Sequence, residues 1–103
     1  MSRDDRNWGL QVEGRVRLGA NVTVRRLRAG ISRNELCARA AISPQRLGQI
    51  ESGTRVATLD VWVRLAGTLG VSLDELLSGV RWVPVPPEEK PGEGAYLVKR
   101  KVA

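Results

Sequence analysis

Apolar residues in the middle of the chain recur at helical spacing, in short segments that end at glycines. The clearest segment lies between Thr58 and Gly70. Its regularly spaced apolar residues are Leu59, Trp62, Leu65, Ala66 and Leu69. Spacings of three and four residues predict a helix with one buried face. Thr58 is a suitable N-cap, and Asp60 places an acid in the first turn, where the helix dipole favours it.

Capping signals predict further helices on both sides of this segment. Ser32 and Ser72 are each followed three residues later by glutamate, which forms a capping box in which each side chain bonds the other residue's backbone N–H. Ser43 followed by Pro44 is a typical helix start, and Gly53 ends that helix. The helix that starts at Ser72 is short and ends at Gly79.

A further helix is expected within residues 10–29, where Leu18, Val22 and Leu27 form the buried stripe and Gly30 ends the helix. The chain is therefore expected to fold as an all-α domain of five helices. Only Ala41, Ile42 and Ser43 separate the second helix from the third. Helices joined by so short a turn cross at a large angle, which is the helix-turn-helix arrangement.

The C-terminal arm has a different pattern. Residues 80–85 favour a β-strand, although Pro84, Pro86 and Pro87 exclude a central strand position. Residues 95–102 form a second candidate strand. A hairpin of the two would be marginal alone and would gain from pairing with a second subunit, which suggests a dimerisation element. The alternative is a flexible basic tail that adds non-specific DNA affinity. Three parts are expected: an N-terminal arm or helix extension (1–17), a helical domain (18–79) and this arm (80–103).

Composition excludes several classes of protein. With 103 residues, 42% hydrophobic and 27% charged, the chain has the length and mixture of one globular domain with an arm. There is no apolar stretch long enough for a membrane span and no signal peptide, so a cytoplasmic, nucleoid-associated protein is expected. The chain has no histidine, and its single cysteine, Cys37, cannot form an internal disulfide or a zinc site and is expected to be a packed core residue. No catalytic constellation can be assembled, so no enzyme activity, cofactor, metal or small-molecule ligand is expected.

The positive charge is concentrated in one part of the chain. The formal net charge is +6, yet residues 14–55 contain nine arginines against Glu35 and Glu51, and the rest of the chain is slightly acidic. Scattered arginines would indicate only a solvated surface. A block this one-sided favours a surface that faces an anionic partner.

An ordered series of short motifs resembles the lambda-repressor/Cro family of helix-turn-helix regulators, also called XRE-type. The series runs through Leu18-Gly19, Gly30-Ile31-Ser32, Glu35-Leu36, Ala41-Ile42-Ser43, Ile50-Glu51-Ser52-Gly53, Thr58-Leu59, Leu65-Ala66, Leu69-Gly70-Val71-Ser72 and Asp74-Glu75-Leu76. The resemblance covers residues 18–79 and implies a compact five-helix domain that binds DNA as a sequence-specific regulator, usually as a dimer. Ala41 departs from the family's usual glycine, and a left-handed backbone there would cost alanine roughly 1 kcal/mol.

The third helix has side chains suited to reading bases. Leu47 and Ile50 are expected to face inward, which leaves Gln45, Arg46 and Gln49 on the outer side. Glutamine can bond adenine, and arginine can bond guanine, in the major groove. The base-reading candidates are Pro44, Gln45, Arg46 and Gln49; the alternative is an ordinary polar helix face. Gly48 would either let the helix approach the groove or allow a close crossing with another helix.

Phosphate contacts are expected to flank this helix. The resemblance implies Arg33 at the start of its helix, and Thr54 and Arg55 after the third helix; Ser43 is a further candidate. The arginines at 25, 26 and 28 would either support the same contacts or form a solvated face. We therefore expect a homodimeric regulator of double-stranded DNA, acting as a repressor, that inserts residues 44–51 into the major groove. The alternative is a protein-interaction module of the same fold, such as an antitoxin or an anti-repressor-type partner.

Overall fold

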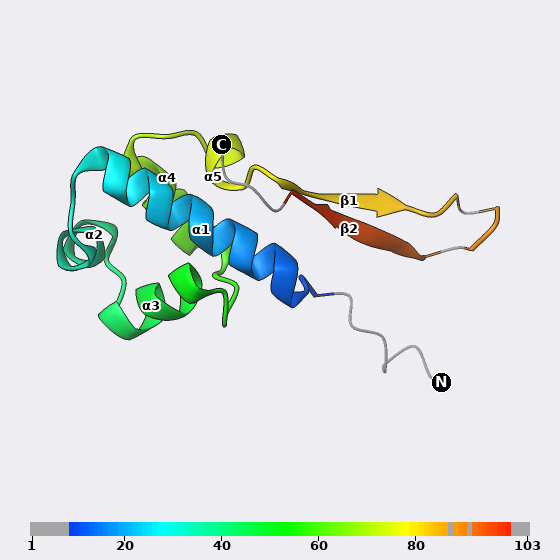
Figure 1. The fold of residues 1–103 in the computed structure, drawn as a ribbon, viewed down its shortest axis with the longest axis horizontal. Coiled ribbons are helices and arrows are strands. Elements are labelled where there is room, and N and C mark those ends of the chain that lie inside the picture. The colour runs from blue at the N-terminus through cyan, green and yellow to red at the C-terminus, as the bar shows by residue number, and fades with distance from the viewer. Residues whose placement is uncertain (1–8, 87, 91, 100–103) are drawn as a thin grey trace.

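A computed structural model of the chain describes residues 9–86, 88–90 and 92–99. Within these residues, five helices are followed by a two-stranded antiparallel hairpin (Figure 1). The helices are α1 (Val12–Ala29), α2 (Arg33–Ala40), α3 (Pro44–Ser52), α4 (Leu59–Leu69) and α5 (Leu73–Leu76), and the strands are β1 (Val80–Pro84) and β2 (Gly94–Val98). The predicted five-helix domain with a β-forming arm is confirmed. Residues 1–8 of the expected N-terminal arm and residues 100–102 of the expected second strand lie outside the described residues.

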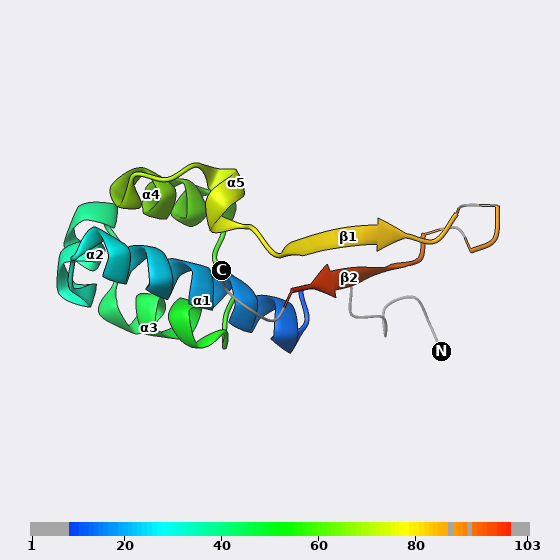
Figure 2. The same ribbon diagram turned by 45° about the horizontal axis from the view of Figure 1, so that its top comes forward.

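The long helix α1 is the centre of the domain. Figure 2 shows α1 between α3 on one side and α4 on the other, with α2 across the end of the group. The core formed between them contains the largest fully buried side chains, which are Val22, Leu36, Leu47, Ile50, Leu65 and Leu76. Within this group α3 packs against α1 and α2. No helix in the described part of the chain has the length and hydrophobicity of a membrane span.

Two residues expected in the buried stripes are exposed. Leu27 is 63% exposed and Leu59 is 66% exposed. Leu18 and Val22 are buried as expected, and the buried face of α1 also includes Arg17 and Asn21, so the expected stripe was wrong only at Leu27. In α4, Val61 is buried and Leu59, the first residue of the helix, is not.

The predicted N-caps are mostly confirmed. The side chains of Ser32, Ser43 and Ser72 each accept a hydrogen bond at 3.1 Å from the backbone N–H three residues later. Thr58 is the N-cap residue of α4, but its hydroxyl donates to the carboxylate of Asp60 and not to the helix backbone. That bond lowers the pKa of Asp60, with a smaller contribution from Arg64. Three of the four expected caps thus satisfy a free backbone N–H group.

The second half of each capping box is not formed. The Glu35 carboxylate pairs with Arg39 at 3.0 Å, and the Glu75 carboxylate lies 3.6 Å from Arg25. Both glutamates are half exposed, and nearby arginine charges attract them more than a backbone N–H does. The last helix is also shorter than expected, since α5 ends at Leu76 and its C-cap is Leu77 instead of Gly79.

The turn between α2 and α3 has the left-handed residue expected at Ala41. Its φ is 56° and its ψ is 54°, and it is the only non-glycine residue with positive φ among the residues described. Nη1 of Arg64, on α4, donates a hydrogen bond of 2.9 Å to the Ala41 carbonyl oxygen. A side chain of α4 therefore holds Ala41 in its strained conformation.

Replacing Ala41 by Gly is expected to stabilise the domain by about 1 kcal/mol, because glycine adopts positive φ without a Cβ clash. The matched control is Ala38→Gly in the exposed part of the same helix, which should destabilise by about 1 kcal/mol through lost helix propensity. Urea unfolding of the two variants measures both effects. If both variants lost the same free energy of unfolding, the left-handed conformation of Ala41 would not destabilise the domain.

The hairpin projects away from the helices (Figure 1), and two buried polar side chains of α1 hold its base. Nδ2 of Asn21 donates to the carbonyl oxygens of Leu76, at 2.9 Å, and Ser78, at 2.7 Å. Arg17 donates to the carbonyls of Ser78, at 3.3 Å, and Lys99, at 3.1 Å. Both side chains are less than a tenth exposed. These bonds, which the sequence did not suggest, fix where the hairpin leaves the helical domain.

Candidate nucleic-acid interface

The outward face of α3 contains the side chains expected there. Leu47 and Ile50 are buried against the core, at 0% and 1% exposure. Pro44 and Gln45 are exposed, and Arg46 and Gln49 are half-buried. Gln45 and Gln49, four residues apart, lie opposite Leu47 and Ile50, while Pro44 and Arg46 lie at the edges of the exposed side of α3.

Gly48 stands in the middle of α3 and leaves its surface open. No atom lies within 4 Å of the position that a Cβ would occupy there. The explanation of Gly48 by a close crossing of helices is therefore wrong within this chain. What remains is a smooth helix surface that an external partner can approach.

Polar groups that can hold a phosphate flank α3 at both ends. At its start, the Ser43 Oγ accepts the capping bond from the Arg46 N–H, which leaves its own hydroxyl hydrogen to donate. At its end, Thr54 Oγ1 donates to the Gln49 carbonyl at 3.2 Å. Arg55 is exposed and forms no ion pair within the described part of the chain. The start of α3 thus offers a hydroxyl hydrogen and the end offers the Arg55 cation, whereas the Thr54 hydroxyl would have to release the Gln49 carbonyl before it could donate to a phosphate.

Glu51 forms the centre of a charged network that the sequence analysis did not recognise. Its carboxylate is only 3% exposed and is bonded on one oxygen by Arg26 Nε at 2.9 Å and on the other by Arg33 Nε at 2.8 Å. Arg26 also donates to the Ile31 carbonyl at 3.3 Å. The network joins α1, the start of α2 and the last turn of α3. The sequence contained one signal of this network, which is a glutamate at the end of a helix within a strongly basic segment.

Arg33 is therefore both a network member and an exposed cation. Its side chain is 63% exposed, and the bond to Glu51 uses only the Nε–H group. A guanidinium has five N–H donors, so Arg33 can bind a phosphate while it remains bonded to Glu51. Arg25 and Arg26, considered as additional phosphate contacts, are engaged with acidic residues of their own chain.

Cys37 packs in the core, as expected, and does not contribute to the surface. It is 6% exposed, and burial raises the pKa of its thiol, with a further contribution from the negative charge of Glu51. A raised pKa keeps the thiol protonated at neutral pH, which makes it a poor nucleophile and metal ligand. Among the described residues, no cluster of potential metal ligands occurs.

Comparison with known proteins identifies related regulators. A family model described as helix-turn-helix matches residues 24–76. The restriction-modification controller protein C.AhdI from Aeromonas hydrophila is similar in structure, with a TM-score of 0.59, 26% identity, and coverage of 60% of this chain and 94% of that protein. The clp gene regulator ClgR from C. glutamicum is similar with a TM-score of 0.59, 26% identity, and coverage of 62% and 83%. No curated protein matches the chain by sequence.

A third solved structure shows the same fold. It is a hypothetical transcription factor, NHTF, from Neisseria, with a TM-score of 0.60, 24% identity, and coverage of 76% of this chain and 80% of that protein. The family match spans just over half of the chain and includes α2, the turn at Ala41 and α3. The chain therefore belongs to the XRE-type helix-turn-helix family of DNA-binding transcription regulators.

Proposed function

We propose that this regulator is a sequence-specific repressor that reads the major groove with residues 44–51 of α3 and acts as a homodimer. The observation that carries the proposal is the exposed side of α3, where Gln45 and Gln49 lie next to the unobstructed Gly48 and Arg46 is partly exposed at the edge. A B-DNA major groove admits one α-helix, and glutamine and arginine have the donor patterns that distinguish adenine and guanine. Repression requires only that the bound protein occupy the site.

Four further side chains would bind the DNA backbone. Ser43 precedes the start of α3, Arg33 reaches the last turn of α3 through its bond to Glu51, and Thr54 and Arg55 follow the end of the helix. Contacts to phosphates on both sides of the groove would fix the register and angle of α3, while the bases are read by its centre. The network around Glu51 supports this role for Arg33, because it ties the cation to the last turn of the reading helix.

Dimerisation would determine the form of the DNA site. Two helix-turn-helix units related by a two-fold axis read two half-sites about one helical turn, roughly 10 base pairs, apart. The site would therefore be an inverted repeat. The roles of C.AhdI as a restriction-modification controller and of ClgR as a clp gene regulator support a regulatory function of this kind here.

Substituting two residues separates base reading from phosphate binding. Gln49→Ala should relax the preference at one position of the half-site by about 10-fold, because a base contact contributes roughly 1–3 kcal/mol of discrimination. Arg55→Ala should instead weaken binding to all sequences alike and reduce the salt slope by about 1. Selection from a random DNA pool, followed by titrations at several salt concentrations, measures both. A uniform loss in Gln49→Ala would contradict a base-reading role.

A second candidate function is a contact with another protein. Leu59 and Val63, four residues apart, form a short exposed apolar stripe on α4 at 66% and 52% exposure, and Val56 in the preceding loop is 46% exposed. Such a stripe favours a protein contact, as in an antitoxin or an anti-repressor-type partner. Gel shifts on genomic DNA fragments across salt concentrations discriminate the two functions, since a pure protein-interaction module gives no shift.

A further inference from the structure

One face of the hairpin combines exposed apolar side chains with basic ones. In the register of β1 and β2, Arg81 lies opposite Leu97 and Val83 lies opposite Ala95. Side chains at alternate positions share a face, so these four residues, continued by Lys99, form what we call the outer face. Leu97 is 50% exposed and Val83 is 37% exposed. A two-stranded hairpin is marginal alone, and an uncovered apolar face on it marks an interaction surface.

The opposite face is directed toward the helical domain. Trp82 and Tyr96 lie edge to face with ring centroids 5.1 Å apart, and they line a hollow together with the start of α1. Val98 lines a second hollow with Val16 and Ala20 of α1. Trp82 of this face is itself 41% exposed, so what distinguishes the outer face is that the cations Arg81 and Lys99 belong to it.

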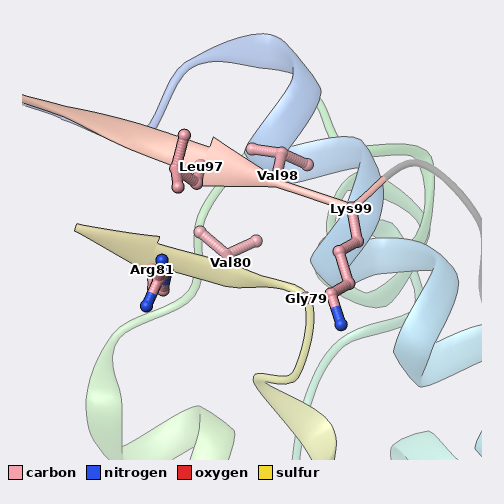
Figure 3. Close-up of a pocket in the computed structure, with 6 residues that line it drawn as sticks. All are labelled: Gly79, Val80, Arg81, Leu97, Val98 and Lys99. Atoms are coloured by element: carbon pink, nitrogen blue, oxygen red, sulfur yellow. The ribbon is translucent and has the colours of Figure 1, made fainter. Parts of the chain in front are cut away.

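The base of the hairpin is positively charged and hollowed. A hollow of about 680 Å³ lies there, and Figure 3 shows the six residues that line it, which are Gly79, Val80, Arg81, Leu97, Val98 and Lys99. Arg81 and Lys99 are exposed and form no ion pair within the residues described. The hollow thus combines apolar walls with two unpaired cations.

The tip of the hairpin has the opposite charge. Between the two strands, Glu88, Glu89 and Glu93 stand against a single Lys90. Glu88 and Glu89 are exposed and make no ion pair in the described segments. Arg81 lies near the start of β1, which runs to Pro84, and Glu88 and Glu89 lie in the turn beyond the end of that strand. The hairpin is therefore polarised along its length, with a positive base and a negative tip.

We propose that the outer face binds the outer face of a second copy of this chain, with the two hairpins antiparallel. A two-fold axis across the strands would place the tip of each hairpin over the base of the other, so that Glu88 and Glu89 meet Arg81 and Lys99 twice in the interface. A two-fold axis along the strands would place tip on tip and base on base, where like charges repel. Charge complementarity therefore favours a second copy of this chain as the partner of the outer face. It also favours the antiparallel arrangement of the two hairpins.

This arrangement rests on the proposed homodimer and gives it a geometry. The hairpin base is bonded to Arg17 and Asn21 of α1, and α1 packs against α3. A rigid connection thus runs from the paired hairpins to the two reading helices. Because the hairpins overlap tip to base, the two helical domains stand at opposite ends of the pair, as two separate half-sites require.

Charge reversal tests the interface in the absence of DNA. Variant A is Arg81→Glu with Lys99→Glu, and variant B is Glu88→Lys with Glu89→Lys. Each should weaken self-association at least 10-fold at low salt in sedimentation equilibrium, since each places like charges at both ends of the pair. An equimolar mixture of A and B should form heterodimers, and the chain with all four changes should recover the wild-type dimer. Thermal unfolding verifies that every variant is folded.

Several results of these measurements would contradict the pairing of the hairpins. If A and B self-associate as tightly as the wild type, or if the wild type is monomeric, the hairpins do not pair in this way. If the mixture stays monomeric while both variants are folded, charge complementarity is not the basis of pairing. A dimer that persists in all variants while Gln49→Ala still changes base preference would reject this interface and leave the proposed DNA reading intact.

Discussion

Replacing Glu51 by Ala should destabilise the domain by about 3–5 kcal/mol, the range for breaking a buried ion pair. The Glu51 carboxylate is 3% exposed, and the side chain of its partner Arg26 is 11% exposed. Removal of the carboxylate leaves the Arg26 guanidinium buried without its counter-charge. It also releases Arg33 from the bond that links the start of α2 to α3.

A matched variant isolates the effect of burial. Glu35 also pairs with an arginine, Arg39, at 3.0 Å, but in that pair the side chains are 48% and 61% exposed. Glu35→Ala should cost about 0.5 kcal/mol or less, because exposed pairs four residues apart contribute little. Urea unfolding compares the two variants. Similar losses in both would show that the Glu51 network does not hold the three helices together.

Local sequence signals located most of the helices correctly, for a physical reason. A serine cap is bonded to an N–H three residues away, as at Ser32 and Ser43, so both partners are visible in a short stretch of sequence. The outward face of α3 was predictable for the same reason, since the spacing of Leu47 and Ile50 defines the inner face. The roles of the outward side chains toward bases and phosphates remain predictions.

Interactions between distant residues were not predictable in this way. Asn21 bonds Ser78 across 57 residues, and Arg33 bonds Glu51 across 18. Hydrophobicity alone assigns Arg17 and Asn21 to the surface and Leu27 to the core, and the structure reverses both assignments. A polar side chain can be buried when its hydrogen-bonding groups have partners, and the partners of Arg17 and Asn21 lie in a distant part of the chain.

The contact between α1 and α3 depends on a glycine that the sequence analysis recognised only within a motif. At Gly19, a Cβ would lie less than 3.0 Å from the carbonyl oxygens of Ile50 and Glu51, closer than real Cβ atoms approach. Both obstacles are backbone atoms of α3 and cannot rotate away. The two helices can therefore cross this closely only without a side chain at residue 19.

Gly19→Ala should consequently destabilise the domain by about 3 kcal/mol, at the upper end of the range for overpacking. The control is Gly67→Ala in α4, where no atom lies within 4 Å of the added Cβ; this change should stabilise by about 0.5–1 kcal/mol through helix propensity. Thermal or urea unfolding gives both values. The same chemical change is thus expected to have opposite signs at two helical positions. A stabilised Gly19→Ala variant would mean that α1 can move away from α3 without cost, and that α1 does not fix the reading helix.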